Sequence, residues 1–353
     1  MSLRISHLPR SSLPLQNPIS GRTVNRTFRY RCTRILSNSF KSTTRLQTKA
    51  VLSEVSDQTR YPRIGAKTTG TISPAHLLEV VELAAKTGAE VRNFITDKAS
   101  EAAILEVVKK NFSDHLILGE EGGIIGDSSS DYLWCIDPLD GTTNFAHGYP
   151  SFAVSVGVLY RGNPAAASVV EFVGGPMCWN TRTFSATAGG GALCNGQKIH
   201  VSKTDAVERA LLITGFGYEH DDAWSTNMEL FKEFTDVSRG VRRLGAAAVD
   251  MCHVALGIAE SYWEYRLKPW DMAAGVLSLI HVRKWTQIVE EAGGAVTRMD
   301  GGKFSVFDRS VLVSNGVLHP KLLERIAPAT ENLKSKGIDF SLWFKPEDYH
   351  TEL

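Results

Sequence analysis

Two aspartates three residues apart, Asp137 and Asp140, end an apolar run and are followed directly by Gly141 and Thr142. At the end of a strand the chain turns sharply, so both carboxylates and the Leu139 carbonyl can converge on one point. Converging hard oxygen atoms are the ligands that Mg²⁺ requires. The two residues after Asp140 are expected to begin a helix, whose first N–H groups can bind an anion. Carboxylates beside a helix N-terminus make chemical sense with an intervening cation, so the pattern predicts a combined metal and phosphate site.

Residues 137–141 alone also fit an ordinary turn in which aspartate side chains cap backbone N–H groups. Further acidic residues favour the metal site instead. Glu120 and Glu121 form an acidic pair, with Glu120 17 residues before the first aspartate, and Asp271 follows Trp270 at the start of an apolar helical pattern. For Glu121 both a direct role and a solvated position outside the site remain open.

This set of residue types suits the hydrolysis of a phosphate monoester. The dianionic ester repels hydroxide, and its alkoxide is a poor leaving group. Two cations solve both problems, because one lowers the pKa of a bound water and the other stabilises the departing oxygen. The carboxylates of Glu120, Asp137, Asp140 and Asp271 suffice to hold two metal ions, and no covalent nucleophile is needed. Cys135 is therefore interpreted as a core residue.

Length and composition fit an ordinary soluble globular chain. The 353 residues correspond to one large or two modest domains, with 43% hydrophobic and 22% charged residues. The five cysteines are scattered without a C-x-x-C pair, which argues against a zinc site or a disulfide framework. No run approaches the roughly 18 apolar residues of a membrane helix, so we expect no membrane partner.

Charge is distributed unevenly along the chain. Residues 1–50 contain eight Arg, two Lys and no acidic residue, so residues 51–353 have 29 basic and 38 acidic groups, a net charge near −9. An acidic body argues against a nucleic-acid partner. The basic, Ser/Thr-rich beginning has no apolar core and is typical of an organelle transit peptide. A chloroplast is the favoured destination and a mitochondrion the alternative.

The remaining chain alternates between helical and strand patterns. Ser73 and Pro74 are suited to begin a helix that runs to about Val91, and a second helix starts near Asp97. Asn195-Gly196 is a strong hairpin signal. The sequence predicts a mixed α/β protein with more than one sheet layer. Its expected strands are Tyr132–Ile136, Phe152–Tyr160, Ala167–Val173, Ala210–Thr214 and Val311–Ser314, and its later helices are Trp224–Thr235 and Ala246–Leu256.

Four motifs in this order resemble the inositol monophosphatase family. They are G-E-E, W-x-I-D-P-L-D-G-T-T-N-F, P-W-D-x-A-A and E-A-G-G, which begin at residues 119, 134, 269 and 291. The resemblance runs from about Ser73 to about Pro328 and is most specific in the long central motif. It implies an α-β-α-β-α sandwich, a homodimer and Mg²⁺-dependent hydrolysis of a small phosphate monoester, most simply myo-inositol monophosphate. The chain looks most like a plastid-targeted plant member.

The resemblance also assigns roles position by position. The residues that match the family's metal ligands are Glu120, Asp137, the Leu139 carbonyl, Asp140 and Asp271, with Asp97 at a further, weaker Mg²⁺ site. Glu120 and Thr142 match the pair that orients the attacking water. The positions that match substrate contacts are Asp140, Gly141, Thr142, Gly245, Ala246, Ala247 and Glu264.

The chain departs from the family pattern in two places. The family normally has a strand–loop–strand with a Lys between its first two helices, whereas here Val91 is followed by only five residues before Asp97. The segment Ser278–Gln287 accounts for about ten residues in excess between Asp271 and Glu291. We therefore expect this chain to be impaired relative to one with the hairpin restored and the insert removed.

The sequence thus predicts a transit peptide (1–50), a linker (51–72), a phosphatase domain (73–331) and a C-terminal extension (332–353). The favoured function is hydrolysis of an inositol or sugar monophosphate. Two alternatives stay open: a phosphatase for histidinol phosphate, another sugar phosphate or a nucleotide bisphosphate, and a non-catalytic protein that binds metal or phosphate.

Overall fold

The computed structural model describes residues 61, 64–91, 97–176 and 178–352. The chain divides into Met1–Gln58 and Thr59–Leu353, and all described residues belong to the second unit. The predicted transit peptide, the short connection before Asp97 and the insert Ser278–Gln287 lie outside the described residues.

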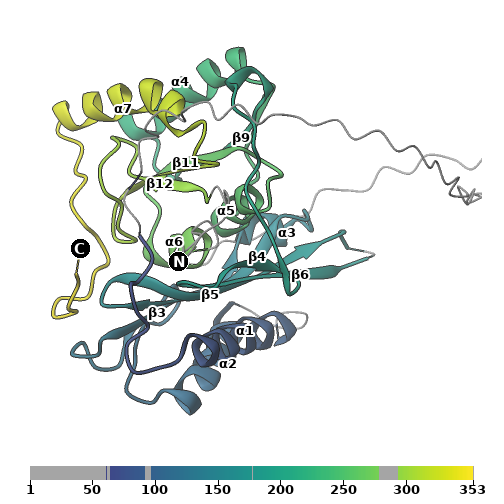
Figure 1. The fold of residues 1–353 in the computed structure, drawn as a ribbon, viewed down its shortest axis with the longest axis vertical. Helices are drawn as coiled ribbons and strands as arrows, with labels where there is room; N and C mark the ends of the chain where they lie inside the picture. Colours follow the sequence, from purple (N-terminus) through teal and green to yellow (C-terminus); the bar gives the residue numbers. More distant parts are fainter. Residues whose placement is uncertain (1–60, 62–63, 92–96, 177, 278–292, 353) are drawn as a thin grey trace, which may run out of the picture. The chain divides into compact units, whose positions relative to one another are not determined.

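The described part of the chain forms five layers in which helices and sheets alternate (Figure 1). Helices α1 and α2 cover one face of a large sheet, α5 and α6 fill the space between this sheet and a smaller one, and α4 and α7 cover the outer face of the smaller sheet. This arrangement confirms the predicted α-β-α-β-α sandwich. The helices are α1 (Pro74–Val91), α2 (Asp97–Asn111), α3 (Thr142–Ala146), α4 (Asp222–Val237), α5 (Ala247–Ala255), α6 (Pro269–Leu277) and α7 (His319–Ser335), with a 3₁₀ turn at Val207–Arg209.

The strands of the two sheets are not in sequence order at the points where the chain crosses between layers. The large sheet has the order β2 (Gly123–Ile125), β1 (Leu116–Gly119), β3 (Tyr132–Asp140), β4 (Phe152–Tyr160), β5 (Asn163–Val173), β6 (Asn180–Thr187), β7 (Gly191–Cys194) and β8 (Gln197–Lys198). The small sheet has the order β10 (Gly240–Arg242), β9 (Leu211–Thr214), β11 (Ser261–Tyr265), β13 (Ser310–Ser314) and β12 (Ala295–Thr297).

Helix α1 illustrates how the sequence specifies its element. The Ser73 hydroxyl accepts a hydrogen bond from the His76 N–H at 3.2 Å, and Pro74 occupies the first turn. The apolar residues at helical spacing, including Leu77 and Val81, are fully buried against the large sheet. The predicted helix from residue 73 to Val91 is confirmed.

Strand β3 runs four residues further than predicted and carries both aspartates of the central motif. All nine of its residues are buried, and it lies parallel to β1 and antiparallel to β4. Its pairing with β4 shifts register between Asp137 and Asp140. A bulge of this kind bends a strand and redirects its side chains. The bulge therefore sets the direction of the two carboxylates.

Helix α6 is packed unusually closely on two sides. An ideal Cβ on Gly157 of β4 would lie 2.9 Å from the backbone carbon of Ala273, and one on Gly275 would lie 2.9 Å from the Met251 Cβ. Real Cβ atoms do not reach such distances, so glycine is required at both contacts. The two contacts fix α6 against the large sheet and against α5.

Residues on both sides of the predicted domain limits also pack into the fold. Ile64 and Ala66, within the predicted linker, are 5% and 8% exposed and belong to the core. Tyr349, in the predicted extension, is 1% exposed. Among the described helices none is long and apolar enough to cross a membrane.

Candidate metal and phosphate site

Glu120 and Asp137 lie side by side because their strands are parallel neighbours. Gly119 at the end of β1 pairs with Ile136 in β3, and the Glu120 N–H donates to the Ile136 carbonyl at 3.1 Å. The two acidic side chains are hydrogen-bonded to each other. Two carboxyl groups that share a hydrogen bond must also share a proton, or else a cation must separate them.

The loop after β3 is organised by its own side chains. The Leu139 N–H donates to the Asp137 carboxylate at 2.8 Å, and the Thr142 hydroxyl donates to the Leu139 carbonyl at 3.1 Å. Gly141 adopts a left-handed conformation (φ 88°, ψ 40°) immediately before α3. A Cβ at this position would approach the Ser151 carbonyl to 2.8 Å, so both backbone angle and space require glycine.

Asp140 joins the large sheet to α5. Its carboxylate accepts hydrogen bonds from the N–H groups of Ala247, Ala248 and Val249 at 2.9, 2.8 and 3.4 Å. These are first-turn groups of α5, which have no partner within their own helix. The segment Gly245–Ala247, predicted to contact substrate, is thus brought directly to Asp140.

Asp271 enters the site from the first turn of α6. Its carboxylate accepts the Lys268 N–H at 2.8 Å, and its own N–H donates to the Lys268 carbonyl at 3.1 Å. The positive charge of Lys268 lowers the pKa of both Asp271 and Glu120. Lys268 was not singled out from the sequence, although its place three residues before Asp271 is the available signal.

The acidic groups are held close enough to disfavour one another's ionisation. Burial, and then the charges of Glu120, Asp140 and Asp271, hold the pKa of Asp137 well above its usual range. Burial and then the charge of Asp271 raise the pKa of Asp140 to about 7. Burial, opposed by Lys268 and reinforced by Glu120, raises the pKa of Asp271 to about 6.

Asp97, the first residue of α2, also faces this group. Its charge contributes to the raised pKa of Glu120, for which burial is the largest cause. Glu121 is exposed and its backbone N–H donates to the buried Glu101 carboxylate at 3.0 Å. Glu101 thus orders the loop that carries the acidic pair, a function that its position on α2 did not reveal in the sequence.

The residues present fit Mg²⁺ by their chemistry. In the described parts of the chain, no three His, Cys, Asp or Glu side chains are grouped closely enough to hold a metal ion with their present side-chain positions. The set nevertheless offers hard oxygen donors, and its carboxylates are opposed by Lys268 alone among the charges that shift their pKa values downward. A divalent cation would relieve this excess of negative charge.

A second group of polar side chains lies beyond Asp140. Glu264 on β11 is 9% exposed and accepts a hydrogen bond from the Tyr262 hydroxyl. Burial raises its pKa to about 8, with further contributions from Asp271 and Asp140 and an opposing one from Arg243. A protonated Glu264 could donate to a substrate hydroxyl as well as accept from one.

Asp250 on α5 is a further buried acid near this group. It is 1% exposed, and neither carboxyl oxygen has a hydrogen-bond partner among the described residues. Burial, and then the charges of Asp140 and Glu264, hold its pKa well above the usual range. Nothing in the sequence separates this acid from an ordinary helical one. Cys135, by contrast, is fully buried as predicted, and burial raises the pKa of its thiol.

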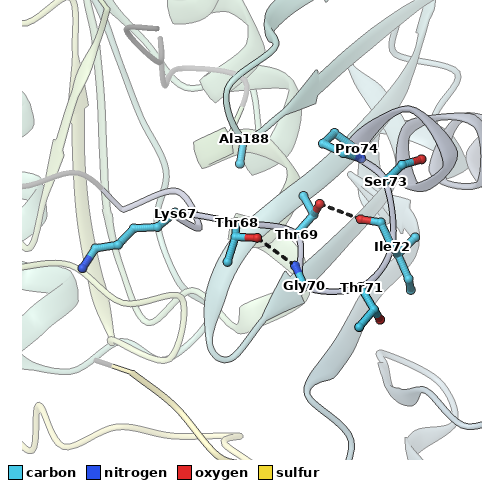
Figure 2. A pocket seen from close by; sticks show the side chains of 9 residues that line it. All are labelled: Lys67, Thr68, Thr69, Gly70, Thr71, Ile72, Ser73, Pro74 and Ala188. Carbon is cyan, nitrogen blue, oxygen red and sulfur yellow. Dashed lines mark hydrogen bonds between the residues drawn. The ribbon is translucent and has the colours of Figure 1, made fainter. Parts of the chain in front are cut away.

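The largest surface cavity lies elsewhere. A cavity of about 420 Å³ is lined by residues 67–74 and Ala188, and none of the candidate acids contributes to it (Figure 2). Two of its polar groups are engaged locally: the Thr69 hydroxyl donates to the Ile72 carbonyl at 2.6 Å, and the Thr68 hydroxyl accepts the Gly70 N–H at 3.2 Å. This cavity is a by-product of the turn before α1.

Comparison with known proteins supports the resemblance found in the sequence. The sequence model described as "Inositol monophosphatase family" matches residues 73–335. "Phosphatase IMPL1, chloroplastic" of Arabidopsis thaliana is 92% identical over 371 aligned positions, which cover 100% of this chain and 97% of the relative. Inositol-1-monophosphatase of Synechocystis is 39% identical over 65% of this chain and 75% of its own length.

A solved structure agrees with these relatives. The structure of inositol monophosphatase from Anabaena superposes with a TM-score of 0.64 at 38% identity, covering 72% of this chain and 96% of that one. The Arabidopsis alignment is 18 positions longer than the 353 residues of this chain, so it contains gaps opposite this chain. The full-length match to a chloroplastic phosphatase confirms the predicted chloroplast location.

Proposed function

The chain belongs to the inositol monophosphatase family, and we propose that it hydrolyses a small phosphate monoester, most simply myo-inositol monophosphate, with Mg²⁺ as cofactor. The observation that carries the proposal is the meeting of carboxylates from three separate chain segments, which raise one another's pKa values and face a single opposing lysine. Such a set is stable as anions only with cations bound.

The donors that would hold the metal are Glu120, Asp137, the Leu139 carbonyl, Asp140 and Asp271, with Asp97 close to Glu120. Bound Mg²⁺ would supply a water of lowered pKa and would stabilise charge on the departing oxygen. We propose that Glu120 and the Thr142 hydroxyl orient that water, since Thr142 is already held to the Leu139 carbonyl.

The substrate would be bound by groups on two sides of Asp140. The N–H groups of Gly141 and Thr142 would bind phosphate oxygens, because they lie at the beginning of α3. Gly245, Ala246 and Ala247 would lie against the polyol, and the Glu264 carboxyl would bind its hydroxyls. These contacts recognise hydroxyl groups in general, so related sugar phosphates remain competing substrates.

Phosphate release from a panel of esters tests the proposal. The panel should contain inositol monophosphate, a hexose phosphate, histidinol phosphate and a nucleotide bisphosphate, each with and without Mg²⁺. We expect turnover that requires Mg²⁺ and is abolished in Asp271→Asn, whereas the exposed Asp236→Asn serves as a charge-matched control. Mg²⁺ binding without turnover on any ester would support the non-catalytic alternative.

Activity should also depend on the shortened connection before Asp97. The family hairpin would supply a lysine and shield the site, and an open site weakens each electrostatic contact. Comparing kcat/KM of this chain with hairpin-restored, insert-deleted and doubly repaired chains tests this; equal values would contradict the expected impairment. Sedimentation analysis would decide whether the chain forms the homodimer that the resemblance implies.

A further inference from the structure

The C-terminal segment Lys336–Glu352 follows the family match, which ends at residue 335, yet it is packed against the elements of the candidate site. We propose that Trp343 and Phe344 of this segment are positioning residues for Asp271. The inference rests on the proposed function, because it gives Asp271 its role as metal ligand. It concerns residues that do not themselves touch metal or substrate.

Trp343 holds the chain just before the Asp271 turn. Its indole N–H donates to the Leu267 carbonyl at 2.9 Å, and its backbone N–H donates to the Phe307 carbonyl at 3.0 Å. The Arg309 guanidinium lies 4.8 Å from the indole ring centre and donates to the Ser341 carbonyl at 2.9 Å. The indole is thus fixed by a cation–π contact and two hydrogen bonds while it holds Leu267.

Phe344 holds the residue on the other side of the same turn. Its ring meets the Trp270 ring edge-on, with centres 5.1 Å apart at 69°. Phe344 has a φ of 56°, a conformation that is costly for a bulky residue and persists only when surrounding contacts enforce it. Its ring is 44% exposed, so solvent alone does not explain why the strained backbone is kept.

The segment between these two contacts is the one that orients Asp271. Leu267 and Trp270 bracket Lys268, whose N–H donates to the Asp271 carboxylate at 2.8 Å. Consecutive tail residues therefore grip both ends of a short turn whose function is to aim one carboxylate. A displacement of about 1 Å at a catalytic group can cost about 100-fold in rate, so this grip matters for chemistry.

The far end of the tail offers a matched control. There the Glu352 carboxylate pairs with Arg161 at 3.1 Å, and the Tyr349 hydroxyl accepts the Gly162 N–H at 3.0 Å. These contacts lie at the β4–β5 turn and involve none of the residues that surround Asp271. Glu352→Gln removes a tail contact without touching the grip on Leu267 and Trp270.

The test uses the full chain with Trp343→Phe, which removes the indole N–H and keeps an aromatic ring, and with Phe344→Ala and Phe344→Tyr. Hydrogen exchange of the metal-free protein reports on the peptide that spans residues 267–277, and calorimetric titration reports on Mg²⁺ affinity. We expect faster exchange at Lys268 and Asp271 and a 3- to 10-fold loss of Mg²⁺ affinity in Trp343→Phe and Phe344→Ala, the range for one lost hydrogen bond. Phe344→Tyr and Glu352→Gln should keep both values.

Two results would overturn the inference. One is unchanged exchange in the metal-free Trp343→Phe and Phe344→Ala proteins, and the other is faster exchange with unchanged Mg²⁺ affinity. A wild-type chain that neither binds Mg²⁺ nor hydrolyses any ester would instead count against the proposed function, while the exchange data would still decide whether the tail positions Asp271.

Discussion

Replacing Asp140 with Asn should change the pH dependence of stability in a direction opposite to its effect on metal binding. In the metal-free protein, burial and the charge of Asp271 raise the pKa of Asp140 to about 7 from a model value of 3.8. Between pH 5 and 7 the unfolded chain has therefore released this proton, whereas the folded chain retains it. Because the folded state binds more protons in this range, stability falls as the pH rises.

The expected size follows from the shift. Each pKa unit corresponds to 1.36 kcal/mol, so the two pH units between pH 5 and the folded pKa correspond to roughly 3 kcal/mol of unfolding free energy. Asn cannot ionise, and its side-chain oxygen can still accept an N–H from Ala247 or Ala248 at the beginning of α5. The variant should thus lose about 3 kcal/mol less than the wild type when the pH is raised from 5 to 8.

Urea unfolding at pH 5 and pH 8, with a chelator and then with saturating Mg²⁺, measures both effects. Without metal, Asp140→Asn should be the more stable protein at pH 8. With Mg²⁺, the wild type should gain stability and the variant should gain much less, because it lacks one charged ligand. Parallel pH curves for the two metal-free proteins would refute the reasoning, and the exposed Asp236→Asn should give such parallel curves.

Three further outcomes are expected. Thr142→Val should lower kcat by about 100-fold or more while Thr142→Ser stays within a fewfold of wild type, since only serine keeps the hydroxyl that donates to the Leu139 carbonyl; equal losses in a steady-state assay would argue against the hydroxyl. A chain that begins at Ala50 should keep the kcat/KM of the full chain, because residues 1–49 contain no acidic or motif residue; loss of activity with preserved circular dichroism would make that segment structural. Glu171→Gln should destabilise the protein by about 3 kcal/mol in urea titrations, because the buried Glu171 carboxylate pairs with Arg182; a change below 1 kcal/mol would show that the pair contributes little.

Elements with a clear local period were predictable from the sequence. The strand Phe152–Tyr160 was predicted with its observed limits, and the helix Pro74–Val91 agrees with its capping serine and buried apolar face. The turn residues Asn195 and Gly196 join β7 to β8, as the hairpin signal indicated. In each case the information lies within one segment, so no distant contact was needed.

The strands that complete the site were not predictable in the same way. Strand β1 has only four residues before Glu120, and β11, which carries Glu264, has five. Short buried runs of this kind are not distinguished from helical segments by their period. Their place in a sheet is decided by pairing with distant strands, such as β3 for β1 and β13 for β11.

Within the candidate site, the motif indicated which acids belong together but not how they are held. The capping of α5 by Asp140 joins residues more than one hundred positions apart. The nearness of Lys268 to Glu120 likewise depends on the packing of α6 against β3. Both features are products of tertiary structure, and local sequence carries no trace of them.

The two glycine contacts of α6 separate the length of the chain after this helix from the position of Asp271. Moving α6 along its axis by one residue is a shift of about 1.5 Å, which would drive other atoms into the space that Gly157 leaves for Ala273 and Met251 leaves for Gly275. The helix is therefore indexed like a keyed shaft, and residues added beyond Leu277 have to be accommodated downstream of it. We accordingly expect that this point of the family's architecture tolerates insertions, and that any deficit in activity is repaired by restoring the hairpin more than by removing Ser278–Gln287.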